Sequence, residues 1–292
     1  MLLLGSIMPE EFIRLQHGYA KNGLSDEVIA LFQNIIYSHY RDNKRDFLWR
    51  KSHDPYHVLV SEFMLQQTQT SRVEQKFSEF ITRFPHFNDL ASASFKEVLS
   101  AWQGLGYNRR ALMLHHLAKK VVHDYKGILP KTKEALITLP GIGEYTAGAI
   151  CAFAYNMPVT LIETNVRTVF LHFFFRNSRG VRDAELLLLI EKTADRNNSR
   201  EWYNALMDYG VMLKQSMPNP SRRSKHHATQ SRFEGSDRQV RGKILRELTQ
   251  HELSFDALVT RVDEPQERMK KILSQLAFES LIVQENGVFR IA

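Results

Sequence analysis

The chain reads Leu139-Pro140-Gly141-Ile142-Gly143 between two stretches with helical periodicity, 133–139 and 145–155. Two glycines separated by one residue let the backbone turn tightly and approach a ligand closely. The start of the second helix also offers backbone N–H groups without partners inside the helix, and such groups bind phosphate. Because the turn follows a helix and not a strand, a dinucleotide-binding loop is disfavoured. This stretch therefore predicts two helices joined by a tight turn that can contact a ligand.

Helical periodicity dominates the rest of the chain up to residue 213. Apolar residues recur at spacings of three and four, as in Val28, Leu31 and Ile35. No stretch in this region alternates between polar and apolar residues as a half-buried strand does. Helices are predicted at 26–40, 58–65, 73–84, 95–102, 110–125, 133–139, 145–155, 166–175, 184–196 and 202–213. The predicted fold class is therefore mainly α.

The sequence changes in two steps after residue 213. Residues 214–238 are rich in proline and basic side chains and poor in apolar ones, which predicts a basic linker. Residues 239–292 then predict three short helices and two apolar runs on either side of Asn286-Gly287. Asn-Gly between two such runs is typical of a β-hairpin. This order predicts a winged helix-turn-helix domain at 239–292; the alternative is a helical cap with a hairpin that binds nothing.

The positive charge of the chain is concentrated in one segment. The formal net charge is +7. Residues 214–246 hold nine Lys or Arg against Glu234 and Asp237, so this segment carries the whole excess. A local excess of this kind favours a polyanionic partner, chiefly nucleic acid or an anionic membrane surface. The alternative is a solvated linker.

The cysteine content excludes several kinds of site. Cys151 is the only cysteine, so a disulfide within the chain and a cysteine-based zinc or iron–sulfur site are excluded. Its apolar neighbours are typical of a small core residue. Residues 1–7 are apolar but too few for a signal peptide or a membrane span. We expect a cytoplasmic, nucleoid-associated protein with no membrane partner.

Seven blocks of the sequence resemble the helix-hairpin-helix DNA glycosylase superfamily. Within that superfamily they resemble the MutY family of adenine glycosylases, and they occur in the order found in that family. They are Trp49-Arg50, Asp54-Pro55-Tyr56, Ser61–Thr70, Trp102–Tyr107, Leu139–Gly143, Glu163–Arg167 and Trp202–Gly210. The related endonuclease III family shares the fold but lacks the block Glu62–Gln69. The resemblance implies a glycosylase domain over 23–213, with two helical lobes and a DNA cleft between them.

The resemblance also implies four catalytic or positioning residues. Removing adenine passes through an oxocarbenium-like transition state, and protonation of N7 makes the base a neutral leaving group. Glu62 occupies the position of that acid. Glu163 occupies the position of the carboxylate that stabilises the sugar cation, and Asn165 that of the asparagine that positions this carboxylate or water. Tyr145 stands where bifunctional relatives carry a Schiff-base lysine, so strand-cleaving lyase activity should be weak or absent.

Glu163 is a departure from the family, which has aspartate at this position. The extra methylene moves the carboxylate by about 1.5 Å. Catalytic groups usually need placement within about half an ångström. Either the pocket has shifted to suit Glu163, or the reaction has changed or been lost.

Other matching positions are implied to hold the DNA. Gln67 and Tyr107 correspond to residues that enter the base stack when a nucleotide is flipped out. Trp49 and Arg50 correspond to residues that line the base pocket, and core packing is the other interpretation of Trp49. The hairpin Gly141-Ile142-Gly143 is expected to hold one DNA phosphate through backbone amides and a monovalent cation.

The chain departs from the family again after residue 213. MutY and endonuclease III carry four cysteines there that hold an iron–sulfur cluster, whereas Lys214 stands in place of the first and no cysteine follows. No iron–sulfur cofactor and no other metal is therefore expected. We expect Arg222, Arg223 and Lys225 to replace the cluster loop as phosphate contacts. His226-His227 is interpreted as a DNA-facing or exposed pair and not as a metal site.

These observations predict a monofunctional DNA glycosylase of base excision repair that removes adenine or a related purine from mispaired or damaged double-stranded DNA, acting as a monomer. Two alternatives stay open. One is a glycosylase for another base, such as uracil, thymine in a G:T mismatch or hypoxanthine. The other is a non-catalytic DNA-binding protein on the same scaffold, which Glu163 and the lost cluster favour and which Glu62 and Asn165 disfavour.

Overall fold

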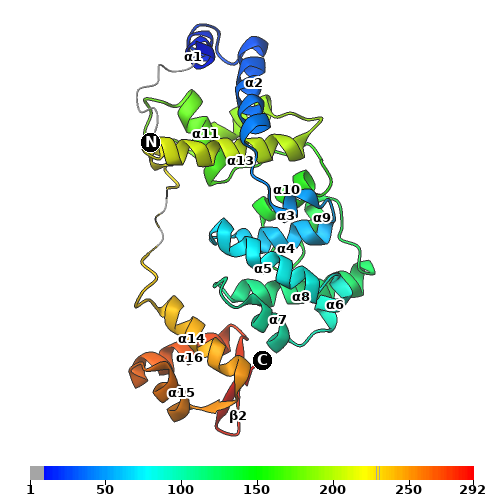
Figure 1. Cartoon of the computed structure of the whole chain (residues 1–292), viewed down its shortest axis with the longest axis vertical. Coiled ribbons are helices and arrows are strands. Elements are labelled where there is room, and N and C mark those ends of the chain that lie inside the picture. Colours follow the sequence, from blue (N-terminus) through cyan, green and yellow to red (C-terminus); the bar gives the residue numbers. More distant parts are fainter. Residues whose placement is uncertain (1–9, 228, 230) are drawn as a thin grey trace. The chain divides into compact units, whose positions relative to one another are not determined.

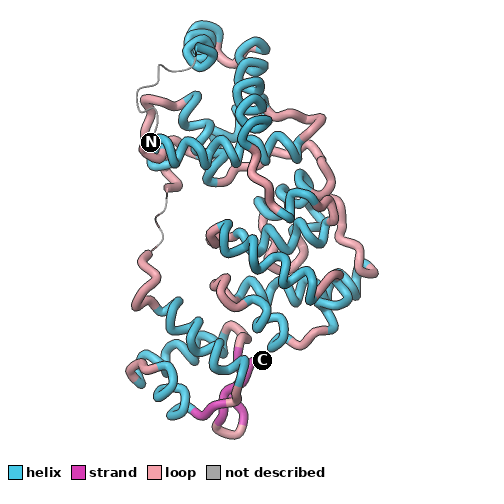
Figure 2. The backbone as a smooth tube through the Cα atoms, viewed as in Figure 1, coloured by secondary structure: helices cyan, strands magenta, loops and turns pink. Residues whose placement is uncertain are grey.

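The computed structural model describes residues 10–227, 229 and 231–292, so the apolar stretch at 1–7 lies outside the described residues. The chain folds into two compact units. The first unit holds the described residues up to Asp46 and those from Glu144 to Thr229; the second holds those from Phe47 to Gly143 and from Ser231 onward. Both units are mainly helical, as predicted (Figure 2). None of the described helices is long and apolar enough to span a lipid bilayer.

The described part of the first unit consists of α-helices and one short 3-10 helix. Its elements are α1 (Glu10–Asn22), α2 (Asp26–Asn43), α10 (Glu144–Phe153), α11 (Thr164–Phe174), α12 (Asp183–Thr193), α13 (Ser199–Ser216) and the 3-10 helix η1 (Pro220–Arg223). Helix α11 packs along α13, and α2 packs against both α13 and α1. The sequence analysis did not predict α1, which buries only Phe12 and Leu15.

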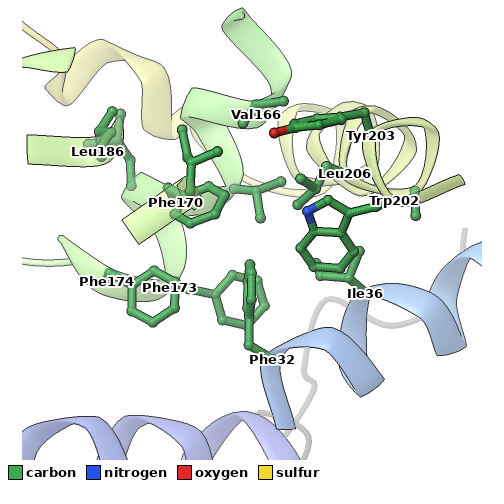
Figure 3. Close-up of a cluster of buried hydrophobic side chains, with 14 of the residues drawn as sticks. Phe32, Ile36, Val166, Phe170, Phe173, Phe174, Leu186, Trp202, Tyr203 and Leu206 are labelled. Carbon is green, nitrogen blue, oxygen red and sulfur yellow. The ribbon is translucent and has the colours of Figure 1, made fainter. Parts of the chain in front are cut away.

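An aromatic cluster forms the core of the first unit (Figure 3). Phe32 of α2 lies edge-on to Phe170 and Phe173 of α11, with ring centroids 5.3 and 5.1 Å away. Trp202 of α13 lies edge-on to the same ring at 5.8 Å. These rings are fully buried, and each such pair contributes about 0.5–1.5 kcal/mol beyond the burial of its area. The cluster fixes α11 against α13, and so holds the start of α11 in place.

The second unit has seven helices before its C-terminal part. They are α3 (Leu48–Lys51), α4 (Pro55–Leu65), α5 (Thr70–Arg83), α6 (Phe87–Ser92), α7 (Phe95–Trp102), α8 (Arg109–Tyr125) and α9 (Lys133–Ile137). Helix α4 begins at Pro55, and the Asp54 side chain accepts a hydrogen bond from the Tyr56 N–H at 2.8 Å. Aspartate at the N-cap followed by proline favours a helix start. Every residue from Val58 to Met64 is buried, so α4 is the central helix of this unit.

The C-terminal part of the second unit ends in a small antiparallel sheet (Figure 1). Its elements are α14 (Asp237–Gln250), β1 (Leu253–Ser254), α15 (Phe255–Val262), α16 (Gln266–Phe278), β2 (Ile282–Glu285) and β3 (Val288–Ile291), with strand order β1-β3-β2. Asn286 and Gly287 join β2 to β3 with φ angles of 50° and 79°. Positive φ at both turn residues is the conformation that Asn-Gly favours, so the predicted hairpin is confirmed. The assignment as a winged helix-turn-helix stays a prediction.

Residues 214–225, which belong to the predicted linker, make defined contacts within the first unit, and the linker boundaries stay a prediction. Helix α13 continues through Lys214, and η1 follows it. Pro220 and Ser221 are buried, and the Lys225 N–H donates to the Val181 carbonyl at 2.9 Å. Backbone and small polar groups make these contacts, so the apolar pattern of the sequence could not predict them.

Candidate active site and nucleic-acid interface

Glu62 lies in the middle of the buried helix α4. Its neighbours Ser61 and Phe63 are 2% and 1% exposed, and Glu62 itself is 8% exposed. Glu62 is therefore a carboxyl group held at a largely buried position on the central helix of this unit.

Glu163 is the N-cap residue of α11, and three hydrogen bonds hold its carboxylate. Oε1 accepts from the backbone N–H groups of Asn165 at 2.7 Å and Val166 at 2.9 Å. Oε2 accepts from Asn165 Nδ2 at 3.2 Å. The helix dipole adds to the stabilisation of a negative charge at this end. The longer side chain thus folds back onto the helix start instead of extending away from it.

The side-chain amide of Asn165 has a hydrogen-bond partner for its nitrogen but none, among the described residues, for its oxygen. Its Nδ2 donates to Glu163, whereas its Oδ1 is buried without a hydrogen-bond partner among the residues described. A buried oxygen without a donor is unfavourable, and a water or a ligand hydroxyl can supply that donor. Helix α13 approaches closely here, because a Cβ added to Gly210 would lie 2.5 Å from the Asn165 carbonyl oxygen.

Lys214 lies one helical turn after Gly210 on the same face of α13. Burial lowers the pKa of its ammonium group, Glu163 raises it and Arg45 lowers it. Arg45 is itself bound to Asp208 of α13, with Nε 2.6 Å from Oδ1. A cation therefore stands at this position of α13, and the Glu163 carboxylate favours its charged form. The sequence analysis did not predict this interaction.

Tyr145 is a half-buried residue in the first turn of α10. No lysine is present in that turn, which reads Glu144-Tyr145-Thr146-Ala147. Tyr145 belongs to the first unit together with Glu163, Asn165 and Lys214, whereas Glu62 belongs to the second unit.

Gln67 and Tyr107 lie on two tight turns of the second unit. Both have a left-handed backbone conformation, with φ angles of 55° and 48°. Both side chains are exposed. Residues other than glycine adopt this conformation rarely, and where they do it is often at a functional site. Exposed side chains on fixed turns suit insertion into a base stack.

Arg110 of α8 ties these two turns together. Its guanidinium donates hydrogen bonds of 2.6–3.3 Å to both. The acceptors are the carbonyl groups of Phe63, Met64, Gln66, Leu105 and Gly106 and the hydroxyl group of Thr68. Burial lowers the pKa of Arg110 to about 10, so the side chain stays charged at neutral pH. Arg110 belongs to none of the sequence motifs, so the sequence did not predict its function.

Replacing Arg110 by methionine is expected to destabilise the protein by about 2–3 kcal/mol, because several acceptors lose their donor. Urea denaturation measures the change in the free energy of unfolding. Lys119→Met is the control, since Lys119 is an exposed residue of the same helix. An Arg110→Met variant as stable as that control would mean that the two turns hold without the guanidinium.

Trp49 and Arg50 lie on the short helix α3. Trp49 is 8% exposed, and its ring stacks on Phe47 at 4.7 Å and meets Phe77 edge-on at 5.7 Å. The guanidinium of Arg50 lies 5.2 Å from the Phe47 ring centroid, and this side chain is half-buried. Trp49 is therefore a core residue, which is compatible with its lining a pocket.

The two glycines of the hairpin have different functions in the fold. Gly141 has a φ of 76°, and an added Cβ would lie 2.8 Å from Met113 Cβ and 2.9 Å from the Phe63 ring. No side chain fits at this position. An atom added to Gly143 would meet nothing within 4 Å. Gly141 is thus required by the packing, whereas the backbone at Gly143 is open to a ligand.

The three basic residues after α13 differ in their surroundings. Arg223 donates to the carbonyls of Leu171 and Phe175 at 3.0 and 3.1 Å, which satisfies acceptors at the end of α11. Arg222 and Lys225 are exposed. The expectation that all three contact phosphate stays a prediction, and the guanidinium of Arg223 already donates to carbonyl groups of the fold. No cluster of His, Cys, Asp and Glu in the described part of the chain is arranged to hold a metal ion.

Comparisons with known proteins agree with the blocks found in the sequence. The family model described as "HhH-GPD superfamily base excision DNA repair protein" matches residues 60–192, a range that contains Glu62 and Glu163. The chain is 34% identical over 282 residues to the adenine DNA glycosylase of Mycolicibacterium smegmatis, covering 88% of this chain and 94% of that protein. It is 34% identical over 236 residues to the adenine DNA glycosylase of Mycobacterium tuberculosis, covering 70% and 74%. The solved structure of a thermostable thymine-DNA glycosylase matches with a TM-score of 0.59 at 27% identity, over 68% of this chain and 90% of that one.

Proposed function

The chain belongs to the HhH-GPD superfamily of base excision DNA repair proteins, and from this premise we propose that it is a monofunctional adenine DNA glycosylase. The observation that carries the proposal is the 34% identity to an adenine DNA glycosylase along 94% of that protein's length. The proposed substrate is double-stranded DNA in which adenine, or a related purine, is mispaired or damaged. The protein is proposed to act as a monomer at the nucleoid.

Glu62 is proposed as the general acid. Once the base is flipped out of the stack, its carboxylic acid donates a proton to N7 of adenine. The bond between N9 and C1′ then breaks, and both bonding electrons leave with the base, which departs as a neutral molecule. The low exposure of Glu62 supports this role.

Glu163 is proposed to stabilise the positive charge that develops on the sugar. Its carboxylate is already held by three hydrogen bonds, so little reorganisation is needed when the charge forms. Water then adds to C1′ and releases a proton, which leaves an abasic sugar. The unpartnered Asn165 Oδ1 supports a role for Asn165 in positioning this water.

Four sets of contacts are proposed to hold the DNA. Gln67 and Tyr107 fill the space that the flipped nucleotide leaves. Trp49-Arg50 lines the base pocket. The backbone at Gly141-Ile142-Gly143 holds a phosphate and a monovalent cation, which the open space beside Gly143 supports. The exposed Arg222 and Lys225 contact further phosphates, as separate sites.

Excision assays on duplexes that carry A, T, U or hypoxanthine opposite G, 8-oxoguanine, C and T test the proposal. Release of adenine is the expected result. Release of thymine or uracil alone would replace it with a pyrimidine-specific activity, like that of the structurally similar thymine-DNA glycosylase. DNA binding without release of any base would favour the non-catalytic alternative.

Tyr145 in place of a lysine is expected to leave the product strand intact. The abasic strand should break only after alkali or heat, and borohydride should trap little covalent adduct, because a phenol cannot form an imine with the sugar. Gel electrophoresis of a labelled duplex measures both results. Efficient trapping would contradict the monofunctional proposal. Lys214, whose pKa is lowered by burial, would then be the first amine to replace.

A further inference from the structure

A basic cavity of about 760 Å³ lies in the second unit, beside the turns that carry Gln67 and Tyr107. Its walls are these turns, the start of α8 and one face of α14. Six arginines line it: Arg72, Arg109, Arg110, Arg238, Arg241 and Arg246. Among the described lining residues the only carboxylate is that of Glu279. A concave surface with such an excess of cations favours an anionic ligand.

Three of the six arginines are bound within the protein. Arg110 donates to the carbonyls of the two turns, as described above. Arg241 donates to Glu279 Oε2 at 2.6 Å, which neutralises the one acidic group of the cavity. Arg238 Nη1 donates to the Tyr107 hydroxyl at 2.8 Å. These three side chains hold the walls of the cavity together.

The other three arginines are free to bind a ligand. Arg72, Arg109 and Arg246 are exposed, and none of them pairs with a carboxylate in the part of the chain that the structure describes. They come from three separate elements, α5, α8 and α14. Cations that converge from separate elements without acidic partners repel one another, and an anion between them relieves that repulsion.

Helix α14 is fixed to the turn that carries Tyr107. The Arg238 guanidinium lies 5.7 Å from the centroid of the Tyr107 ring in addition to its hydrogen bond. Gln103 Nε2 also donates to Thr249 Oγ1 of α14 at 2.6 Å. The arginines of α14 are therefore held at a defined place beside this turn.

We propose that this cavity binds the sugar–phosphate backbone of DNA next to the point at which Tyr107 enters the base stack. The inference rests on the proposed function, which places Tyr107 in the DNA. A phosphodiester carries one negative charge shared by two non-bridging oxygens, which a guanidinium can bind in a bidentate manner. Arg72, Arg109 and Arg246 make these contacts. The C-terminal region thus contacts DNA through α14, independently of the β2–β3 hairpin.

The test replaces Arg109 and Arg246 by glutamine, singly and together, in the full chain. Lys271→Gln is the matched control, because it removes one exposed positive charge from α16 of the same unit, outside the cavity. The probe is a duplex with a stable tetrahydrofuran analogue of an abasic site, so that binding is measured without base excision. Fluorescence anisotropy at several salt concentrations gives the slope of log affinity against log salt.

Each lost phosphate contact should reduce the magnitude of that slope by about 0.9, and the double variant should lose about 1.8. Lys271→Gln should match the wild-type slope. The thermal midpoints of all variants should stay at the wild-type value, since the Arg109 and Arg246 side chains make no hydrogen bond to the described residues that would be lost. A double variant with the control's slope would overturn the inference even if the wild type excises adenine. A reduced slope in a protein that excises no base would support the cavity and refute the proposed function.

Discussion

Glu62→Gln is expected to lower the rate of adenine excision by about 10²- to 10⁴-fold, because glutamine cannot donate the proton that makes adenine a neutral leaving group. The two side chains are almost equal in size, so the buried residues Ser61 and Phe63 keep their packing. Single-turnover excision with enzyme in excess measures this chemical step directly.

Measurements of DNA binding and of thermal stability show whether the slower excision comes from the chemical step alone. The affinity of Glu62→Gln for a duplex with a tetrahydrofuran abasic-site analogue should equal that of the wild type. Glu74→Gln is the control, since Glu74 is an exposed carboxylate on α5 of the same unit, and it should excise at the wild-type rate. Wild-type excision by Glu62→Gln would exclude Glu62 as the acid. Loss of both DNA affinity and thermal stability would instead indicate that the substitution disrupts the folding of α4.

Periodicity and turn chemistry predicted much of the fold, because these signals are local. Helix α4 begins at Asp54-Pro55, and the hairpin turns at Asn286-Gly287, as their residue types require. Helix α1 was missed because Phe12 and Leu15 alone make its buried face, which is too short a pattern to show a period. Local signals thus predicted the longer helices, which have a full apolar face, and missed α1 and the short helices α3 and α6.

Candidate site residues that belong to a sequence motif could be predicted. The residues that hold them in place through tertiary contacts could not. Arg110 binds carbonyl groups, which every residue carries, so no pattern of side chains marks its partners. Glu163 raises the pKa of Lys214 across the contact between α11 and α13, which pack closely at Gly210. The charge of Arg223 suggested DNA, whereas its acceptors lie at the end of α11. These contacts depend on tertiary packing between residues far apart in the sequence.

Glu163→Gln is expected to lower the excision rate by about 10²- to 10³-fold, because the sugar cation loses its stabilising charge. The glutamine Oε1 can still accept from the Asn165 and Val166 N–H groups, so α11 keeps its cap, but Nε2 cannot accept from Asn165 Nδ2 and that hydrogen bond is lost. Loss of the charge and of this hydrogen bond should lower the free energy of unfolding by about 1–2.5 kcal/mol. Single-turnover excision and urea denaturation measure the two effects separately.

A matched control removes a carboxylate from the start of another helix in the same unit. Glu185 lies in the first turn of α12, and its Oε2 accepts from the Arg182 N–H at 3.0 Å. Glu185→Gln should therefore show at most a small loss of stability with a wild-type excision rate. A Glu163→Gln enzyme that excises as fast as this control would remove Glu163 from the mechanism.

Glu163→Asp introduces the aspartate that the family has at this position. This variant tests whether the pocket has adapted to glutamate or whether glutamate weakens the enzyme. Aspartate is also a good N-cap, but its carboxylate ends about 1.5 Å short of the present one, and catalytic groups need placement within about half an ångström. If the surroundings built by Asn165 and Lys214 have adapted to glutamate, Glu163→Asp should be slower than the wild type. It should still be faster than Glu163→Gln, because it keeps the charge. An aspartate variant faster than the wild type would mean that the pocket still fits the shorter side chain and that glutamate weakens the enzyme.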